Sequence, residues 1–162
     1  MQNLLLRAAK PDDASAIADV YLASRTTFLA YAPLAHSDAE VRQWIRAQLL
    51  PAASVTVADI GGEVAGFVAT NSDGPLLWID QLYVRPDAVN LGLGGRLLGY
   101  ALAGVTQAVR LYTFQANAGA RRFYERHGFK PLEFTDGQSN EERCPDVLYG
   151  RAEQPVADHT TD

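Results

Sequence analysis

Residues 89–98 read Val89-Asn90-Leu91-Gly92-Leu93-Gly94-Gly95-Arg96-Leu97-Leu98, a glycine-rich segment that is the most informative part of the chain. It lies between an apolar stretch typical of a strand, Leu76–Val84, and an apolar pattern with helical spacing that continues to Val105. Such a turn exposes consecutive backbone N–H groups at the positive end of a helix, and the missing side chains let an anion approach them. By itself the segment fits either an anion site or a closely packed helix start.

Two common phosphate-binding motifs do not match this segment. A dinucleotide fingerprint would need a third glycine where Leu97 stands, and it would normally follow the first strand. A P-loop would end in Gly-Lys-Ser or Gly-Lys-Thr, and neither tripeptide occurs in the chain. The segment therefore is neither of these two motifs, and it fits another kind of phosphate-bearing ligand or no ligand at all.

The remaining pattern predicts a mixed sheet. The predicted strands are residues 4–8, 54–60, 64–70, 76–84, 110–115, 130–134 and 147–150. Four helices are predicted. The first follows Pro11-Asp12-Asp13, and the second runs from the capping box Ser37–Glu40 to Pro51. The third covers residues 93–105, and the fourth runs from Asn117 to His127. Because a helix connects residues 76–84 to residues 110–115, those two strands should be parallel. We therefore expect an α/β (α+β) fold: a mixed, mostly antiparallel sheet of about seven strands with one central parallel pair, flanked by about four helices.

Length and composition restrict the class of protein. A chain of 162 residues with 48% hydrophobic and 20% charged residues suits one globular domain, which we place at residues 1–150, before a polar, disordered tail at 151–162. The net charge of −5 argues against a nucleic-acid partner. One cysteine, Cys144, expected in a strand, excludes an intrachain disulfide and multi-thiolate zinc sites, and no metal is expected. With no secretory signal and no apolar run of ~20 residues, we expect a cytoplasmic protein without a membrane partner.

Several motifs together carry a resemblance to a known family. They are Leu82-Tyr83-Val84-Arg85-Pro86, Gly92-Leu93-Gly94 with Leu97-Leu98, Asn117, and Phe123-Tyr124-Glu125-Arg126-His127-Gly128-Phe129. In this order and spacing, across residues 4–150, the chain resembles the GNAT superfamily of acetyl-coenzyme A dependent N-acetyltransferases. One departure concerns the phosphate turn, where the family usually carries Gln or Arg, then often Gly, at the positions of Val89 and Asn90. The change removes a phosphate contact and leaves the backbone donors.

The resemblance implies acetyl-CoA as the co-substrate and assigns positions that would contact it. The backbone of Leu82 and Val84 would pair with the pantetheine amides, as an added strand pairs with a sheet edge, and Asn117 would contact the same arm. As a helix N-cap, Asn117 also has a sufficient structural role. The assigned positions are Leu82, Val84, Val89, Asn90, Leu91, Gly92, Leu93, Gly94, Gly95, Asn117 and Tyr124.

Two residues are candidates for the chemistry of acetyl transfer. Strand alternation would place Trp78, Asp80, Leu82 and Val84 on one face, so that Asp80 is an acid on an apolar stripe and a candidate general base. A buried ion pair or a cap would explain Asp80 as well. The resemblance makes Tyr124 the general acid, because a phenol with a pKa near ~10 is protonated at pH 7 and can donate to a departing thiolate. Aromatic packing beside Phe123 is the alternative.

The acceptor amine is not identified by the sequence. Tyr21, Arg25, Phe28, Tyr31 and His36 lie around the first helix, and each fits either the acceptor pocket or ordinary core and surface. Arg121, Arg122 and Arg126 would meet the coenzyme phosphates or offset the acidic tail. We predict an N-acetyltransferase for a small-molecule or peptide amine, in which the amine attacks the thioester directly and no acyl group passes through Cys144; a homodimer is compatible with this prediction. The alternative is a CoA-binding or regulatory module without efficient catalysis.

Overall fold

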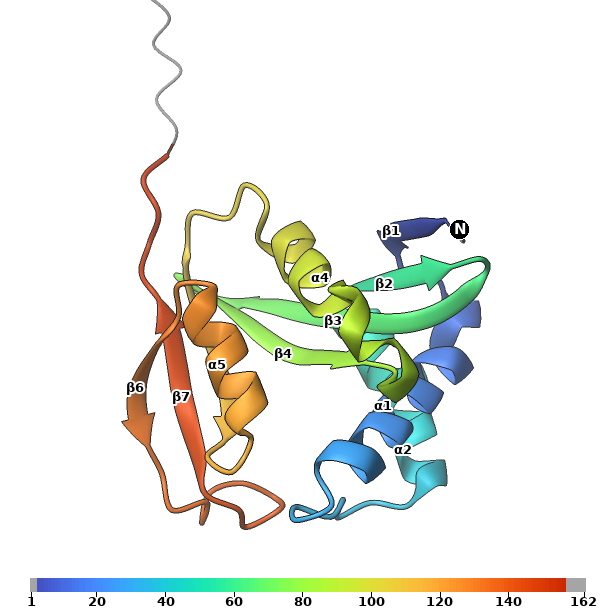
Figure 1. Ribbon diagram of the computed structural model, residues 1–162, viewed down its shortest axis with the longest axis horizontal. Helices are drawn as coiled ribbons and strands as arrows, with labels where there is room; N and C mark the ends of the chain where they lie inside the picture. The colour runs from blue at the N-terminus through green and yellow to red at the C-terminus, as the bar shows by residue number, and fades with distance from the viewer. Residues whose placement is uncertain (1–2, 157–162) are drawn as a thin grey trace, which may run out of the picture.

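The apolar runs form a seven-stranded sheet in the computed structural model, which describes residues 3–156 (Figure 1). Its spatial order is β1-β2-β3-β4-β5-β7-β6. Every neighbouring pair is antiparallel except β4 and β5, which are parallel. The strands are β1 (Leu4–Ala8), β2 (Ser54–Ile60), β3 (Glu63–Asp73), β4 (Leu76–Val84), β5 (Ala108–Phe114), β6 (Lys130–Phe134) and β7 (Asp146–Arg151). The mixed sheet with one central parallel pair is therefore confirmed.

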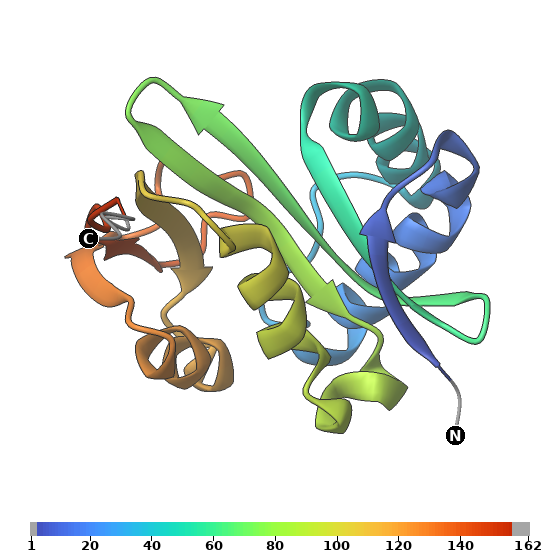
Figure 2. The ribbon, with the colours of Figure 1, turned by 90° about the horizontal axis from the view of Figure 1, so that it is seen from above.

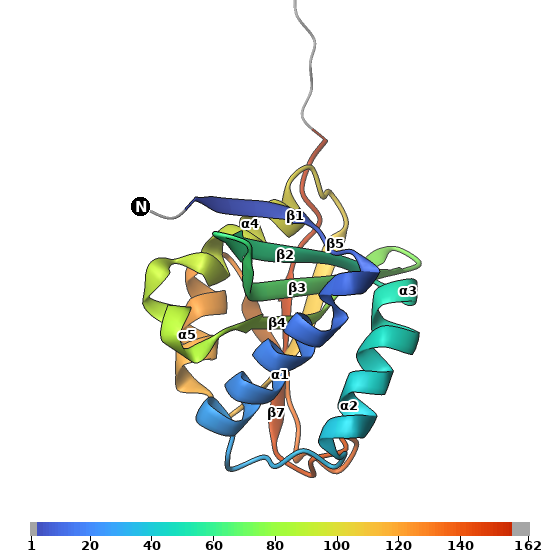
Figure 3. The same cartoon turned by 90° about the vertical axis from the view of Figure 1, so that its right-hand side faces the viewer.

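Helices cover both faces of this sheet (Figure 2). They are α1 (Ala14–Phe28), α2 (Asp38–Trp44), which continues through a π-helical turn (Ile45–Leu49) into α3 (Leu50–Ala52), α4 (Leu93–Leu102) and α5 (Ala118–Arg126). Figure 3 shows α1, α2 and α3 on one side, with α4 and α5 on the other. Short 3₁₀ turns, Pro11–Asp13 and Pro86–Leu91, precede α1 and α4. None of the helices in residues 3–156 combines the length and the hydropathy of a membrane span.

Each face of the sheet has its own hydrophobic core. Ile17 of α1 and Ile45 pack with Val57 and Phe67 on one face, and all four are fully buried. On the other face Leu97 and Leu98 of α4 pack against the strands, together with Val109, Leu111, Val147 and Tyr149. Burial of apolar area on both faces fixes the position of α1 and α4 relative to the central strand β4.

Two helix boundaries differ from expectation for local reasons. The helix expected to reach Val105 ends at Leu102, because Gly104 adopts a left-handed conformation with φ of 72°. The second helix passes Pro51 by one residue. A π-helical turn precedes this proline, whose ring does not fit the interior of a regular α-helix.

The expected side-chain alternation of β4 is wrong. Ala69 pairs with Gln81 but Thr70 pairs with Ile79, so Asp80 is the extra residue of a β-bulge. The bulge reverses the alternation, and Leu82 therefore shares the α4 face with Ile79 and not with Trp78. Trp78 stacks on Tyr112 of β5 instead, with ring centroids 5.9 Å apart.

The C-terminal region shows two further differences. Cys144 lies in the β6–β7 connection, before β7 begins at Asp146, and so is not a strand residue. Arg151 belongs to β7, and the Gln154 N–H donates to the Thr106 carbonyl at 2.9 Å. The predicted disorder of residues 157–162 lies outside the described residues.

Removing the cap of α2 should lower stability. The Ser37 hydroxyl accepts from the Glu40 N–H at 3.2 Å, and the Glu40 carboxylate accepts from the Ser37 N–H at 3.1 Å. We expect Ser37→Ala to lower the free energy of unfolding by about 1 kcal/mol, because an N-cap hydroxyl satisfies an otherwise unpaired donor. Urea unfolding measures this change. Ser72→Ala, at an exposed strand position, is the control, and an equal loss in both variants would contradict the capping role.

Candidate active site

The parallel pair of strands separates soon after it forms. Only Leu76–Trp78 of β4 pairs with Ala108–Arg110 of β5, and beyond Trp78 the strands diverge. On its other edge, β4 stays paired with β3, where the Arg85 N–H donates to the Ala65 carbonyl at 2.7 Å. Because backbone groups in an antiparallel ladder alternate in direction, Leu82 and Val84 direct their N–H and C=O groups toward the opening. The fold thus leaves a short unpaired strand edge beside α5.

A cleft of about 740 Å³ lies along this edge, and we call it the α4–α5 cleft. The end of β4, the 3₁₀ turn, the start of α4, α5 and the end of α1 form its walls. Among the residues that line it are Leu82, Tyr83, Val84, Val89, Asn90, Gly94, Asn117, Arg122, Phe123, Tyr124 and Arg126. It therefore brings together the glycine turn, the free edge of β4 and two arginines of α5.

The start of α4 offers free backbone donors to this cleft. Gly92 is the N-cap, has φ of 73° and provides no capping side chain. The first N–H of α4 that donates to a backbone carbonyl is that of Arg96, which donates to the Gly92 carbonyl at 3.3 Å. The N–H groups of Leu93, Gly94 and Gly95 therefore have no backbone acceptor within the helix, and free donors at the positive end of a helix are the groups that an anion would use.

Close packing does not by itself require glycine at positions 94 and 95, because a Cβ at either would make only ordinary contacts. A Cβ at Gly94 would lie 3.5 Å from the Phe123 ring, and one at Gly95 would lie 3.6 Å from His127. Leu93 is buried among Ala65 and Ala88, which fixes the turn against the sheet. Of the predicted turn residues, Val89, Asn90 and Gly94 line the α4–α5 cleft, while Leu91 projects outward and is 62% exposed.

Tyr124 lies where the α4–α5 cleft meets the opening between β4 and β5. Its ring packs against Phe123, Phe129 and Tyr149, with ring centroids 5.1, 5.7 and 6.3 Å away. Burial raises the pKa of its phenol above the ordinary value, and the nearby Tyr83 adds to this effect. The hydroxyl makes no hydrogen bond to any other residue between 3 and 156. The Tyr124 hydroxyl therefore stays protonated and is free to donate a hydrogen bond to a ligand in the cleft.

Asn117 begins α5 on the same wall. Its side-chain oxygen accepts from the Ala120 N–H at 3.1 Å, as expected for an N-cap. Its amide nitrogen is not used by that bond, and the residue lines both the α4–α5 cleft and the opening between the strands. The capping role is confirmed and leaves a donor available.

Asp80 borders two smaller cavities at the bulge. One, of about 110 Å³, lies between the diverging strands and is called the fork pocket. The other, of about 570 Å³, is bounded by α1, β5 and the β6–β7 connection, and is called the hairpin pocket. Partial burial raises the pKa of the Asp80 carboxyl. A carboxylate whose pKa rises toward neutrality is a better proton acceptor at neutral pH than an ordinary aspartate.

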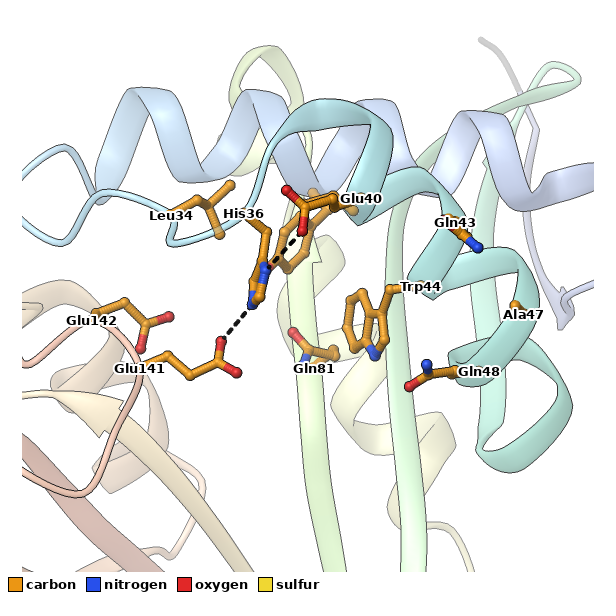
Figure 4. Close-up of a pocket in the computed structure, with 12 residues that line it drawn as sticks. Leu34, His36, Glu40, Gln43, Trp44, Ala47, Gln48, Gln81, Glu141 and Glu142 are labelled. Carbon is orange, nitrogen blue, oxygen red and sulfur yellow. Dashed lines mark hydrogen bonds and ion pairs between the residues drawn. The ribbon is translucent and has the colours of Figure 1, made fainter.

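A third cavity, of about 630 Å³, lies under α2 and is called the helix pocket (Figure 4). Tyr21 and Trp44 form an aromatic wall, with ring centroids 5.8 Å apart. His36 also lines this pocket, and it contacts Glu40 and Glu141. Gln81 lines this pocket and also the fork and hairpin pockets, so the three cavities meet at the bulge of β4.

The five residues considered for the acceptor pocket are divided between cavities, and Arg25 lines the hairpin pocket. Tyr21 and His36 line the helix pocket, whereas Phe28 and Tyr31 line the α4–α5 cleft. The structure therefore does not bring them together as one pocket. Arg121 also lies apart from Arg122 and Arg126, because it donates to the Tyr149 hydroxyl at 3.1 Å.

Sequence reasoning missed Gln81 and Tyr83. Both follow the bulge, and Tyr83 lines the α4–α5 cleft and the fork and hairpin pockets. Burial raises the pKa of Tyr83, and Arg25 opposes this effect. The run of residues around Asp80 carries no local signal for the bulge, which is defined by the partner strand β3.

Arg25 holds the β6–β7 connection against α1. Its guanidinium is 5% exposed and donates to Glu142 at 3.2 Å and to the Ala32 carbonyl at 3.0 Å. It also lies over the rings of Tyr21 and Phe114, at 6.0 and 5.7 Å from their centroids. The charge of Glu142 is thus matched inside the protein.

The geometry suits a long ligand with an anionic end. Free N–H groups and two arginines are suited to an anion, and an unpaired strand edge is suited to amide groups. The cleft leads from them to Tyr124 and then to the bulge. From the other side of β4, the helix and hairpin pockets reach the same bulge. Two ligands approaching from opposite sides would meet near Asp80, Gln81 and Tyr124.

Comparisons with known proteins agree with this arrangement. The model of the acetyltransferase (GNAT) family matches residues 17–129. The N-acetyltransferase YhfO of Bacillus subtilis, itself uncharacterized, is 30% identical over 136 residues, which cover 77% of this chain and 89% of YhfO. An uncharacterized N-acetyltransferase of Archaeoglobus fulgidus is 30% identical over 131 residues, covering 74% and 88% of the two chains.

Solved structures share the fold at lower identity. The PaiA N-acetyltransferase of Thermoplasma acidophilum, in complex with coenzyme A, superimposes with a TM-score of 0.72 at 20% identity, covering 93% of this chain and 99% of that one. The ribosomal-protein-S18-alanine N-acetyltransferase of Escherichia coli gives a TM-score of 0.74 at 16% identity, covering 99% and 100%.

Proposed function

We propose that this chain, which belongs to the acetyltransferase (GNAT) family, moves the acetyl group of acetyl-CoA to a primary amine by direct attack of the amine. The observation that supports this most is the α4–α5 cleft, which combines an anion site, a free strand edge and a phenol along one wall. The acceptor would be a small-molecule or peptide amine that approaches through the pockets on the other side of β4.

The cleft fits the coenzyme in three respects. The free N–H groups at the start of α4 would receive its pyrophosphate, and Arg122 and Arg126 would add positive charge. The backbone of Leu82 and Val84 would pair with the pantetheine amides. Asn117 would offer its amide nitrogen to the same arm. Val89 gives the phosphates no polar side chain, and the arginines of α5 offer charge in its place.

The chemistry needs a neutral amine, a stabilised oxyanion and a proton for the leaving sulfur. Asp80, or water beside it, would accept the proton of the ammonium form of the acceptor. The amine nitrogen would then bond to the thioester carbonyl carbon, and backbone N–H groups of β4 would stabilise the oxygen. As the carbon–sulfur bond breaks, the attacking nitrogen would lose its second proton to water and Tyr124 would donate a hydrogen bond or proton to the sulfur. A Tyr124 that has given up its proton regains one from water, and the amide and the free thiol are the products.

The first experiment is a calorimetric titration of acetyl-CoA into the full chain, followed by measurement of free thiol released with a panel of amines. Micromolar binding with thiol release supports a transferase. Binding without release to any amine would favour the alternative, a CoA-binding or regulatory module, for which the exposed Val89 in the phosphate turn is the supporting observation. No binding would overturn both.

Asp80→Asn tests the proposed base. We expect kcat/KM to fall about tenfold at neutral pH, a modest loss because water can share the role. In the native protein, kcat/KM should also decrease as pH falls through the raised pKa of Asp80, since only the carboxylate accepts a proton. This acidic limb should be absent from the variant. Asp73→Asn, at an exposed position of β3, is the control, and an acidic limb that keeps the same midpoint in Asp80→Asn would exclude Asp80.

A further inference from the structure

His36 forms a bridge between two segments that are far apart in sequence. Its Nε2 lies 3.1 Å from the Glu141 carboxylate of the β6–β7 connection, and its Nδ1 lies 3.5 Å from the Glu40 carboxylate of α2 (Figure 4). A carboxylate faces each ring nitrogen, which is the arrangement that suits an imidazolium, because a neutral ring can donate from one nitrogen only. The bridge crosses one side of the helix pocket.

The charges around the helix pocket do not cancel without this imidazolium. Three carboxylates line it, those of Glu40, Glu141 and Glu142, and none of the described lining residues is lysine or arginine. Glu142 is paired with the buried Arg25. Within residues 3–156, His36, which is 46% exposed, is the one ion-pair partner of Glu40 and Glu141. When His36 is neutral, the pocket therefore carries two uncompensated negative charges.

The pocket also has apolar lining residues, beside the amide side chains of Gln43 and Gln48. Trp44 and Tyr21 face the pocket with Leu34, Val41 and Ala47, and this surface would accept a chain of methylene groups. Gln81 connects the pocket to the bulge of β4, where the proposed reaction occurs. Glu40 and Glu141 line the same pocket, so a ligand that extends into it from the bulge would bring a cation beside them.

Building on the proposed function, we propose that the acceptor is an aliphatic diamine or polyamine: one amine reacts at the bulge, the carbon chain lies against Trp44 and Tyr21, and a second ammonium replaces the His36 imidazolium between Glu40 and Glu141. A monoamine of equal length has no second ammonium, so Glu40 and Glu141 would stay paired with His36. His36 is then a specificity residue, since its charge competes with that of the acceptor.

The electrostatic environment makes this competition depend on pH. The hydrogen bond to Glu141 raises the pKa of His36, and Glu40 contributes in the same direction. The other titratable groups that face the pocket are Glu142, paired with Arg25, and Tyr21. An aliphatic ammonium, with a pKa near ~10.4, stays charged after His36 has lost its proton. The preference for a diamine should therefore increase with pH across the titration of His36.

The test compares matched acceptors in a thiol-release assay with the full chain and acetyl-CoA. The probes are α,ω-diaminoalkanes of three to six carbons, n-alkylamines of the same lengths, and a peptide with one lysine. Above the His36 pKa, we expect the best diamine to exceed its matched monoamine at least about tenfold in kcat/KM, which is about 1.4 kcal/mol. Both acceptors react as the deprotonated amine, so the ratio is corrected for the pKa values of each acceptor and for the two equivalent amines of the diamine.

Glu141→Gln should reduce the diamine-to-monoamine ratio to within about twofold of unity. Glu141 suits this test because it is exposed and lies outside the capping box, whereas Glu40 also caps α2. His36→Ala should make the ratio independent of pH. Glu153→Gln, at an exposed position outside the cavities described above, should leave it unchanged.

The outcomes separate this inference from the proposed function. Equal kcat/KM for diamine and monoamine, or an unchanged ratio in Glu141→Gln, would overturn the diamine assignment while acetyl transfer itself stands. A strong preference for the lysine peptide over every diamine would also overturn it. Absence of thiol release with all three classes would instead remove the transferase function.

Discussion

Gly94→Glu is expected to weaken binding of acetyl-CoA at least about 100-fold, which corresponds to about 2.8 kcal/mol. The substitution places a carboxylate in the first turn of α4, beside the N–H groups proposed to receive the coenzyme phosphates. Two unit charges 4 Å apart near a protein surface repel by about 4 kcal/mol, so a single carboxylate is sufficient for this loss. Calorimetric titration of acetyl-CoA measures it directly.

The variant should fold, because the position tolerates a Cβ. A side chain begun at Gly94 would meet the Phe123 ring at 3.5 Å, an ordinary contact, and the backbone of Gly94 does not need the left-handed conformation that Gly92 adopts. Gly99→Glu is the matched control. It adds the same charge to the same helix. A Cβ at Gly99 would meet no atom within 4 Å, and Gly99 lines none of the cavities described above.

The control determines what a loss of binding means. If only Gly94→Glu loses the coenzyme, the start of α4 is the phosphate site. If both variants lose it equally, the effect is the added charge on the whole protein, and the assignment to the glycine turn fails. Raising the salt concentration should reduce the difference between the variants only in part, because the pair would be enclosed in the cleft.

Much of the fold follows from local sequence patterns. The bounds of β1, β2, β4 and β6 agree with prediction because turn residues border these strands, as in Gly61-Gly62 between β2 and β3. The capping box at Ser37 and the N-cap at Asn117 fix helix starts in the same local way. The parallel pair follows from its helical connection alone.

The candidate site was less accessible to sequence reasoning, because long-range pairing builds it. Asp80 becomes a bulge residue only through the register of β3, and the predicted face of β4 was therefore wrong. The helix and hairpin pockets depend on contacts between segments more than a hundred residues apart, such as those of His36 with Glu141 and of Arg25 with Glu142. The hydrophobic periodicity of a single helix or strand does not predict which distant residues will pair.

Tyr124→Phe should lower kcat about 10²-fold, with little change in the affinity for acetyl-CoA. The substitution removes one hydroxyl and keeps the ring that packs against Phe123 and Phe129. Because burial raises the pKa of the phenol, Tyr124 stays protonated at neutral pH and is a weaker acid than a free phenol. It would therefore act mainly by a hydrogen bond to the leaving sulfur, and the loss should lie at the lower end of the range for acid–base groups.

Tyr149→Phe is the matched control for this variant, since it removes a hydroxyl from a neighbouring ring of the same core. Tyr149 is fully buried, lies outside the cavities described above and accepts a hydrogen bond from Arg121 at 3.1 Å. Its loss should cost about 1 kcal/mol of stability and leave kcat unchanged. The pH profile of Tyr124→Phe should keep its shape between about pH 6 and 9, because a phenol with a raised pKa does not titrate there. An unchanged kcat in Tyr124→Phe would remove the phenol from the mechanism and leave water as the proton donor.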